Sequence, residues 1–389
     1  MGSKMKSAAQ LYFNKDHEMV RQAVRDFVIK ELDPHLDDWE EQGIAPLHEI
    51  FRKMGDLGFL GIRYATEIGG QGLDLWADLV FLEEIAHIKA MSLPISIYIQ
   101  THSATPVIDE FGSEYLKETY LTPALAGKLV ASIAITEPDA GSDVAALRTF
   151  AVKEGDTYVI NGSKIYITNG CQADFIVLLA RTSENPGYHS FSLIIVPTDT
   201  PGFTVGRKLD KIGMRSSDTA ELFFDNVRVP AENRIGEEGE GFIYQMRQFQ
   251  HERFTTLPLG YVASRDMIDL TVEHIKKRIV FGEPLVRKQV LRHRIANWLT
   301  EIECLKNLTF HIVRMKEAGL DVTREVSMGK LRAGQLLRQV SDGCVQMFGG
   351  IGYMNEMLIA RYFRDARIVS IAGGADEVMC DVIAKLEGF

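Results

Sequence analysis

The stretch I-A-I-T-E-P-D-A-G-S-D, Ile133–Asp143, lies where the periodicity of the chain changes from helical to β. A short apolar run ends at Pro138, and the turn that follows carries hydroxyl groups and free backbone amides around Gly141. Consecutive amides of this kind form concavities that bind anions, so the stretch is suited to a phosphate or a similar polar group. An ordinary junction between a strand and a loop would show the same residues.

Short β runs extend from this stretch to about residue 234. They are Phe175–Ala180, Phe191–Pro197, Phe203–Arg207 and Thr219–Val229. Asn161-Gly162, between two further runs (157–160 and 164–168), predicts a hairpin because both residues accept positive φ. This part of the chain therefore predicts a β domain, a small barrel or sandwich.

Helical spacing governs the residues on both sides of the β runs. Val20, Val24 and Phe27 belong to the stripe of a first helix, which we expect Pro34 to end. Toward the C-terminus, one predicted stripe consists of Ile268, Val272, Ile275 and Ile279. The order helical, β, helical predicts an α+β protein with domains at 1–129, 130–240 and 241–389. No G-x-G-x-x-G follows a strand, so any dinucleotide binds without a Rossmann turn.

Composition excludes several classes of protein. Of 389 residues, 46% are apolar and 25% charged, which is incompatible with a largely disordered chain. The 43 Lys and Arg against 53 Asp and Glu give a net charge of −10, which argues against general binding of nucleic acid or anionic membranes. No apolar run approaches the ~18 residues of a membrane-spanning helix. Four dispersed cysteines and ten scattered histidines indicate neither a disulfide framework nor a metal site.

Tyr166 and Thr168, in N-G-S-K-I-Y-I-T-N-G (Asn161–Gly170), share one face of a strand by its period of two. An aromatic ring beside a hydroxyl could cover a flat ligand, although a hairpin that faces solvent explains the pair equally well. Arg278 follows two lysines, and a solvated helix face is the ordinary interpretation of that run.

Together these stretches resemble the acyl-CoA dehydrogenase family, and the resemblance covers essentially the whole chain. Further motifs follow in order and with matching spacing: K-I-G-M-R-S-S-D-T-A-E-L-F-F-D-N-V-R-V-P (211–230), G-E-E-G-E-G-F (236–242), R-I-V-F-G-E-P-L (278–285), Q-M-F-G-G-I-G-Y (346–353) and R-Y-F-R-D-A-R (361–367). The resemblance implies an N-terminal helical domain, a middle β-barrel or sandwich, and a C-terminal four-helix bundle. It also implies a homotetramer, a dimer of dimers.

The resemblance further implies FAD, bound in an extended form. Tyr166 and Thr168 would cover the isoalloxazine ring, although Trp is common in the family at the position of Tyr166. Arg278 would reach a phosphate of the neighbouring subunit's FAD, for which its planar fork is suited. The residues implied to bind FAD are Ile133, Ile135, Thr136, Ser142, Tyr166, Thr168, Arg278, Phe281, Gln289, Gln346, Gly349, Gly350 and Glu377.

In the family, a carboxylate removes the α-proton of an acyl-CoA thioester while a hydride leaves the β-carbon for the flavin, which gives a trans-2-enoyl-CoA. The enolate is stabilised by a flavin ribityl hydroxyl and by a backbone N–H in the loop that matches Ala372–Ala375. An electron-transferring flavoprotein is the usual electron acceptor. Two alternatives are an acyl-CoA oxidase that passes electrons to oxygen and a non-catalytic relative that binds acyl-CoA or FAD.

The chain departs from the family's commonest pattern at the catalytic base. Many members carry a Glu just before the Gly of an E-G-T-x-E/Q turn, and Gly373 occupies that position here. Either the protein is inactive or another carboxylate enters the same space. Long-chain and isovaleryl relatives carry their Glu in an x-E-R segment at the start of the first C-terminal helix. Q-H-E-R, Gln250–Arg253, places Glu252 there, and we expect it to be the base, with a raised pKa.

A solvated Glu252, favoured near a helix start by the dipole, is the alternative, and Pro258 is expected to kink this helix. Ser142, Arg253 and Gly373 are the residues implied to contact substrate. The ending S-I-A-G-G-A-D-E-V, from Ser370, resembles members that act on branched or terpenoid chains such as citronellyl-CoA, so a long or branched acyl chain is expected. The expected compartment is the mitochondrial matrix in a eukaryote or the cytoplasm in a bacterium.

Overall fold

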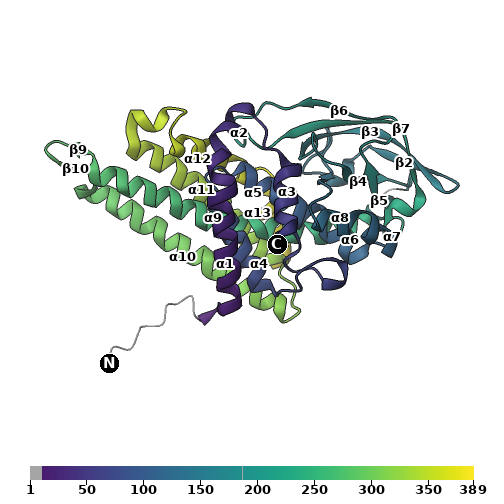
Figure 1. Ribbon diagram of the computed structural model, residues 1–389, viewed down its shortest axis with the longest axis horizontal. Coiled ribbons are helices and arrows are strands. Elements are labelled where there is room, and N and C mark those ends of the chain that lie inside the picture. The colour runs from purple at the N-terminus through teal and green to yellow at the C-terminus, as the bar shows by residue number, and fades with distance from the viewer. Residues whose placement is uncertain (1–10, 186) are drawn as a thin grey trace.

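The computed structural model describes residues 11–185 and 187–389, and it divides into helical, β and helical parts in that order. Figure 1 shows the β part at one end of the molecule and the long C-terminal helices reaching toward the other, with the N-terminal helices between them. The predicted α+β architecture is confirmed. The N-terminal helices are α1 (Lys15–Phe27), α2 (Leu36–Gln42), α3 (Leu47–Asp56), α4 (Leu75–Ile85), α5 (Ser92–Tyr98), α6 (Pro106–Phe111), α7 (Glu114–Leu116) and α8 (Thr122–Leu125).

Pro34 does not end the first helical stretch, and that prediction was wrong. A π-helical segment (Val28–Leu32) and a 3-10 turn (Asp33–His35) connect α1 to α2. Pro34 lies in the first positions of the 3-10 turn, where its missing N–H removes no hydrogen bond. The chain therefore continues in helical form to Gln42.

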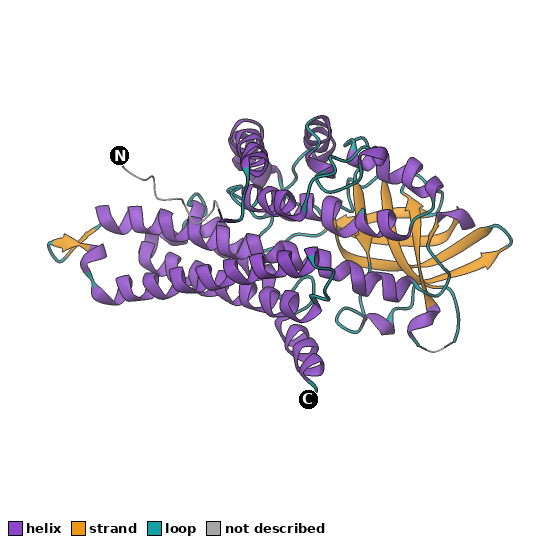
Figure 2. Ribbon diagram, turned by 90° about the horizontal axis from the view of Figure 1, so that it is seen from below, coloured by secondary structure: helices purple, strands orange, loops and turns teal. Residues whose placement is uncertain are grey.

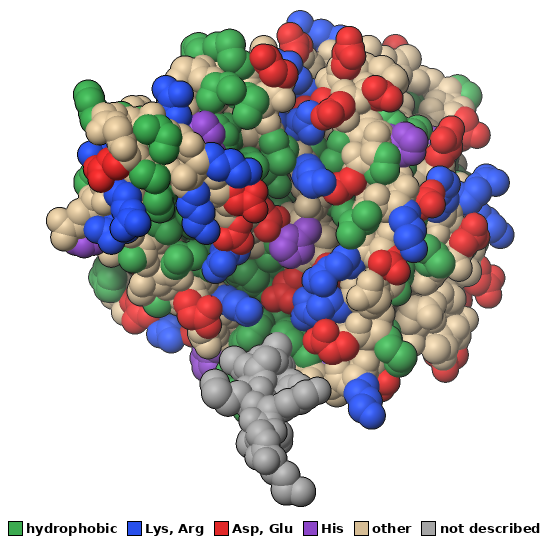
Figure 3. All heavy atoms as spheres, turned by 60° about the vertical axis from the view of Figure 1, so that its left-hand side comes forward, with side chains coloured by type: hydrophobic (Ala, Val, Ile, Leu, Met, Phe, Trp, Pro, Cys, Tyr) green, Lys and Arg blue, Asp and Glu red, His purple; other side chains and the backbone are tan. Residues whose placement is uncertain are grey.

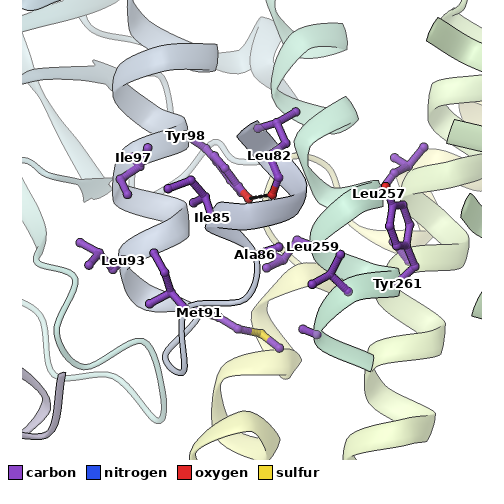
Figure 4. Packing of buried hydrophobic residues seen from close by; sticks show 14 of the residues in the cluster. Leu82, Ile85, Ala86, Met91, Leu93, Ile97, Tyr98, Leu257, Leu259 and Tyr261 are labelled. Atoms are coloured by element: carbon purple, nitrogen blue, oxygen red, sulfur yellow. Dashed lines mark hydrogen bonds between the residues drawn. The ribbon is translucent and has the colours of Figure 1, made fainter. Parts of the chain in front are cut away.

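The packing of α4 and α5 against the C-terminal part is apolar and fully buried. Figure 4 shows Leu82 and Ile85 of α4 between Ile97 of α5 on one side and Leu257 and Leu259 of α9 (Gly241–Lys277) on the other. Burying each of these side chains contributes roughly 1.5–3 kcal/mol. The contact therefore fixes α9, which carries Glu252, relative to the N-terminal helices.

One eight-stranded sheet forms the β part. Its strands run in the order β6-β7-β3-β2-β4-β5-β8, and β1 pairs with β4 in parallel. Figure 2 shows the curved sheet, with helices on one side. The strands are β1 (Ala131–Ala134), β2 (Phe150–Glu154), β3 (Thr157–Thr168), β4 (Phe175–Arg181), β5 (Phe191–Pro197), β6 (Phe203–Lys208), β7 (Thr219–Pro230) and β8 (Arg234–Ile235).

β4 and β5 are buried on both faces. Phe175 and Val177 pack with the N-terminal helices, while Ile176 and Leu178 belong to the core between the two halves of the sheet. A strand covered on both sides has no solvated positions, which explains the continuous apolar runs. Because Ile133 pairs with Val177, β1 is held on this rigid strand.

The predicted hairpin at Asn161-Gly162 is wrong, because β3 continues through both residues. Gly162 has φ +150° beside a register shift against β7, and an added Cβ would lie 2.8 Å from Thr149 Cα. The Gly therefore accommodates a β-bulge and a close backbone approach. The hairpin turn lies instead at Gly155-Asp156, between β2 and β3.

Three long helices and two shorter ones form the C-terminal part. α9 runs through Pro258 as one helix, so the expected kink does not interrupt it. Ile279 lies beyond α9, in the β9–β10 hairpin, so the predicted stripe ends one turn earlier, at Ile275. The other elements are β9 (Ile279–Val280), β10 (Glu283–Pro284), α10 (Gln289–Glu317), α11 (Thr323–Phe348), α12 (Leu358–Ala366) and α13 (Asp376–Glu387).

Charged side chains of both signs are mixed on the face of the molecule that Figure 3 shows. On the face in Figure 3, the Lys and Arg side chains alternate with Asp and Glu, and apolar side chains lie among them. Among the described residues, none of the helices is apolar over a length that would cross a bilayer.

A buried ion pair connects β3 to the segment after β1. Lys164 Nζ donates to Glu137 Oε1 at 2.9 Å and to the Ile135 carbonyl at 2.8 Å. Burial lowers the pKa of Lys164 to about 8. Burial would raise the pKa of Glu137, but attraction to Lys164 and hydrogen bonds from Arg148 and Thr149 bring it below its ordinary value. Both groups are therefore charged at neutral pH and hold Ile133–Glu137 against β3.

We expect Lys164→Met to destabilise the protein by about 3–5 kcal/mol, because it leaves the Glu137 carboxylate buried without its cation. Arg207→Met is the matched control, since the Arg207–Glu221 pair lies on the exposed side of the same sheet and is worth less than about 1 kcal/mol. Urea unfolding of both variants measures the difference. Equal midpoints for the two variants would contradict this role of Lys164.

Candidate active site

Glu252 lies about three turns into α9, and not at a helix start. The helix begins at Gly241, so the dipole of its first turn does not account for this half-buried carboxylate. The side chain points to the loop between α12 and α13. A Cβ placed on Gly373 would be 3.2 Å from Glu252 Oε1. The Glu252 carboxylate of α9 therefore lies beside Gly373, where the loop between α12 and α13 has no side chain.

The loop at Gly373-Gly374 is anchored from several sides. Both glycines have positive φ, +65° and +103°. Ala372 N–H donates to the Ile368 carbonyl at 2.9 Å, and Arg253 Nε donates to the Gly373 carbonyl at 3.1 Å. Within the described part of the chain, the N–H of Gly373 has no hydrogen-bond acceptor. An N–H donor is thus available beside the Glu252 carboxylate.

Electrostatics around Glu252 combine burial with two cations. Burial raises the pKa of Glu252, while attraction to Arg253 and Lys330 and the nearby Ser103 hydroxyl oppose the rise. Burial also lowers the pKa of Arg253, and attraction to Glu252 opposes that change. A carboxylate with a raised pKa can remove a weakly acidic proton, and a free N–H beside it can stabilise the oxyanion that forms.

The sequence-predicted residues on β1 and β3 lie close together. Ile165 N–H donates to the Thr136 carbonyl at 2.9 Å, and Ser132 Oγ donates to the Thr168 carbonyl at 2.6 Å. Ile133 is half-buried, Ile135 is buried and Ser142 is exposed. The segment from β1 to Thr136 therefore lies against β3, although β1 itself pairs with β4, and Ser142 lies in the turn beyond this segment.

Tyr166 is exposed although it is a large aromatic residue within a strand. Its side chain is 66% exposed, and its backbone has φ +62° at a second register shift of β3. Thr168 is half-buried, and Ile167 between them is buried. A non-glycine residue at positive φ stores strain of the kind that gathers at ligand sites. The ring is free to cover a flat ligand.

A second group of predicted residues lies at the far end of the helical bundle. Figure 1 shows the β9–β10 hairpin there, opposite the β part. Phe281, in the turn of this hairpin, has φ +52° and is 95% exposed. The other members are also exposed: Arg278, Gln289, Gln346, Gly349 and Gly350. Within one chain, the residues of this second group therefore lie far from the predicted residues on β1 and β3. Glu377 belongs to neither group and is exposed in the first turn of α13.

Sequence reasoning missed Lys330. Its ammonium is fully buried and donates to the Gly374 carbonyl. The signal was present, because Lys330 interrupts an apolar stripe of α11 at helical spacing, between Val326 and Ala333. In the described part of the chain, no group of His, Cys, Asp and Glu is arranged to hold a metal ion.

Two curated relatives show how far the similarity extends. The long-chain specific acyl-CoA dehydrogenase of Sus scrofa mitochondria is 37% identical over 376 residues, which cover 96% of this chain and 86% of the relative. The short-chain specific acyl-CoA dehydrogenase of Rattus norvegicus mitochondria is 36% identical, with 95% and 89% covered. Relatives named for different chain lengths are thus almost equally similar.

Two solved structures share the fold. The acyl-CoA dehydrogenase from Geobacillus kaustophilus superimposes with a TM-score of 0.94 at 39% identity and covers 97% of this chain and 99% of its own. A glutaryl-CoA dehydrogenase from Mycobacterium smegmatis, solved in complex with FADH2, has a TM-score of 0.90 at 28% identity, with 98% and 96% covered.

Family models match almost the whole length of the chain. The acyl-CoA dehydrogenase N-terminal domain matches residues 14–128, the middle domain residues 132–227 and the C-terminal domain residues 239–387. The helical, β and helical parts thus correspond to these three models in order. The chain belongs to the acyl-CoA dehydrogenase family of flavin-dependent oxidoreductases.

Proposed function

We propose that this protein dehydrogenates the Cα–Cβ bond of an acyl-CoA thioester with FAD as cofactor and Glu252 as base. The observation that carries the proposal is the carboxylate of Glu252 beside Gly373, 3.2 Å from the position of a Cβ there. The loop between α12 and α13 has no side chain at Gly373, and Glu252 of α9 supplies the carboxylate at that place. An inactive relative would need neither the matching space nor a carboxylate with a raised pKa in it.

Glu252 removes the α-proton. Because burial raises its pKa, the carboxylate is a stronger base than an exposed Glu, and attraction to Arg253 and Lys330 opposes the rise. The free N–H of Gly373 donates to the thioester carbonyl oxygen as negative charge develops on it. Arg253 holds the Gly373 carbonyl. The residues that we propose to contact the substrate are Ser142, Arg253 and Gly373.

The residues present fit FAD. Tyr166 offers an exposed ring beside the Thr168 backbone, and the turn around Ser142 offers amides and hydroxyls. Phe281, Gly349 and Gly350 have open surface around them. When bound, FAD supplies the acceptor for the hydride that leaves Cβ. From the resemblance to the family, an electron-transferring flavoprotein is the proposed acceptor that reoxidises the reduced flavin.

A second copy of the chain completes the cofactor site in this proposal. Arg278, Phe281 and Gln289 would contact the FAD held by β1 and β3 of a neighbour, together with Gln346, Gly349 and Gly350. The position of this group, at the end of the bundle away from the β part, supports an arrangement across a subunit interface (Figure 1). The proposed assembly is a homotetramer, a dimer of dimers.

Glu252→Gln tests the base. We expect FAD to be retained and flavin reduction by acyl-CoA in stopped-flow to slow by about 10²–10⁴-fold, because Gln cannot accept the α-proton. Glu273→Gln, at an exposed position of the same helix, is the control and should stay within about twofold. In the wild type, reduction should weaken as pH falls through the raised pKa of Glu252, so the acidic limb lies above 4.5. A loss of less than about tenfold in Glu252→Gln rejects this base.

Arg278→Ala tests the shared cofactor site. We expect the purified wild type to carry FAD and to have a light-scattering mass well above the 43.6 kDa of one chain, and the variant to lose FAD more readily. A ligand that spans an interface stabilises the assembly by mass action, so added FAD should restore the variant's mass. Arg207→Ala, on the exposed β6 strand, should behave as wild type. A 43.6 kDa species with full flavin occupancy would rule out the shared site.

A panel of acyl-CoA substrates tests the chain-length proposal. We expect a long or branched chain, such as palmitoyl-, isovaleryl- or citronellyl-CoA, to give a higher kcat/KM than butyryl-CoA, on the resemblance of the Ser370–Val378 segment. Initial rates with an artificial electron acceptor measure this. Preference for butyryl-CoA contradicts the substrate proposal, hydrogen peroxide release indicates an oxidase, and failure of every acyl-CoA to bleach the flavin anaerobically indicates a non-catalytic relative.

A further inference from the structure

Two cations hold consecutive carbonyl groups of the loop beside Glu252. Arg253 Nε donates to the Gly373 carbonyl at 3.1 Å, and Lys330 Nζ donates to the Gly374 carbonyl. Arg253 comes from α9 and Lys330 from α11, so the loop is held from two helices. Gly374 also lies close to the Arg253 guanidinium, which is 3.5 Å from the position of an added Cβ.

Within the described ranges of the chain, no ion pair compensates for the burial of Lys330, although attraction to Asp376 partly opposes the lowering of its pKa by burial. Its side chain is fully buried, and among the described residues it forms no ion pair within 4.0 Å. Asp376, a nearby carboxylate, is 3.6 Å from Arg338. A buried ammonium that donates to a neutral carbonyl is costly, and an apolar side chain in the Val326–Leu337 stripe would pack at lower cost.

The loop itself lacks intrinsic rigidity. Gly373 and Gly374 are consecutive glycines at positive φ, and glycine loses more conformational freedom on ordering than any other residue. The Ala372 N–H holds the loop on its N-terminal side. On the other side, the carbonyls of both glycines depend on Arg253 and Lys330. A free N–H on Gly373 keeps one direction only if the peptides after it are fixed.

We propose that Lys330 is a positioning residue for the dehydrogenation: by binding the Gly374 carbonyl, it keeps the Gly373 N–H and the Glu252 carboxylate in one relative placement. This inference rests on the proposed function of Glu252 and Gly373. Lys330 touches neither the substrate nor FAD in it, and it acts through the loop.

Lys330 has a second, electrostatic consequence for Glu252. The charged and polar groups that face this carboxylate are Arg253 on its own helix, Lys330 from α11 and Ser103 from the π-helical segment Ile99–Ala104. Both cations lower the pKa of Glu252 against the effect of burial. Removing the charge of Lys330 therefore raises the pKa of Glu252 further, and the acidic limb of flavin reduction moves to higher pH.

Two substitutions separate the hydrogen bond from the charge. Lys330→Met removes both, while Lys330→Gln keeps an N–H donor for the Gly374 carbonyl and removes the charge. Lys316→Met is the matched control: burial lowers the pKa of both Lys330 and Lys316 to about 8, but Lys316 lies on α10 beside the Phe254 ring. Each variant is studied as FAD-loaded protein, with the panel member that reduces wild-type flavin fastest.

We expect Lys330→Met to lower the limiting rate of flavin reduction by about ten- to a hundredfold, with little change in KM, and to move the acidic limb upward. Lys330→Gln should reduce its flavin at a rate close to that of the wild type, while the acidic limb of its pH profile should lie at higher pH, as in Lys330→Met. Lys316→Met should show the wild-type rate of flavin reduction and the wild-type pH profile. If Lys330→Met does not fold, Lys330→Ala, which also lacks an N–H donor, replaces it, and the difference in rate between Lys330→Ala and Lys330→Gln tests the positioning role.

Wild-type rate and limb in Lys330→Met would overturn the positioning role. Equal rate losses in both Lys330 variants, with an unmoved limb, would also overturn it, because that pattern reports only a damaged core. These outcomes differ from failure of the proposed function itself, which would appear as full activity in Glu252→Gln.

Discussion

The close approach of α9 and α11 is the constraint on which the site depends. An added Cβ on Gly260 would be 2.7 Å from Ala333 Cβ, and one on Gly329 would be 2.8 Å from Leu257 Cγ. The two helices therefore touch where each presents a glycine to the other, as ridges that pack into shallow grooves. Glu252 lies two turns before this contact on α9, and Lys330 directly at it on α11. The distance between the carboxylate and the ammonium is thus set by backbone packing.

In the proposed function, a carboxylate on α9 takes the place of a carboxylate on the loop, and the same helix packing allows this. A proton is removed by an oxygen at the right place, and the element that carries the oxygen is irrelevant to the chemistry. With Gly373 in the loop, the loop contributes only backbone groups, and the side chain comes from the rigid helix. A base on a packed helix is placed more precisely than one on a loop of two glycines. The cost is that the loop needs support, which Arg253 and Lys330 supply.

The sequence predicts the strands well and the local irregularities poorly. β4 and β5 follow from apolar runs of strand length, because burial on both faces leaves no polar positions, whereas β7 alternates buried and exposed residues. Asn161-Gly162 has the composition of a turn, but the need for space beside Thr149 is a tertiary contact that no local pattern contains. Lys330 was missed for a related reason: a lysine in an apolar stripe marks a partner, and only the folded chain shows that the partner is the Gly374 carbonyl.

Two exposed aromatic residues support the proposal that a second copy of the chain completes the cofactor site. Tyr166 and Phe281 are each held at positive φ with most of their ring surface exposed, on parts of the molecule that lie apart. Strain and apolar exposure both cost free energy, and neither ring is covered by other described residues of the same chain. A cofactor long enough to lie between the β part of one copy and the bundle end of another would cover both rings at once. Burial of the same surface would then stabilise both the assembly and the bound cofactor, so that each strengthens the other.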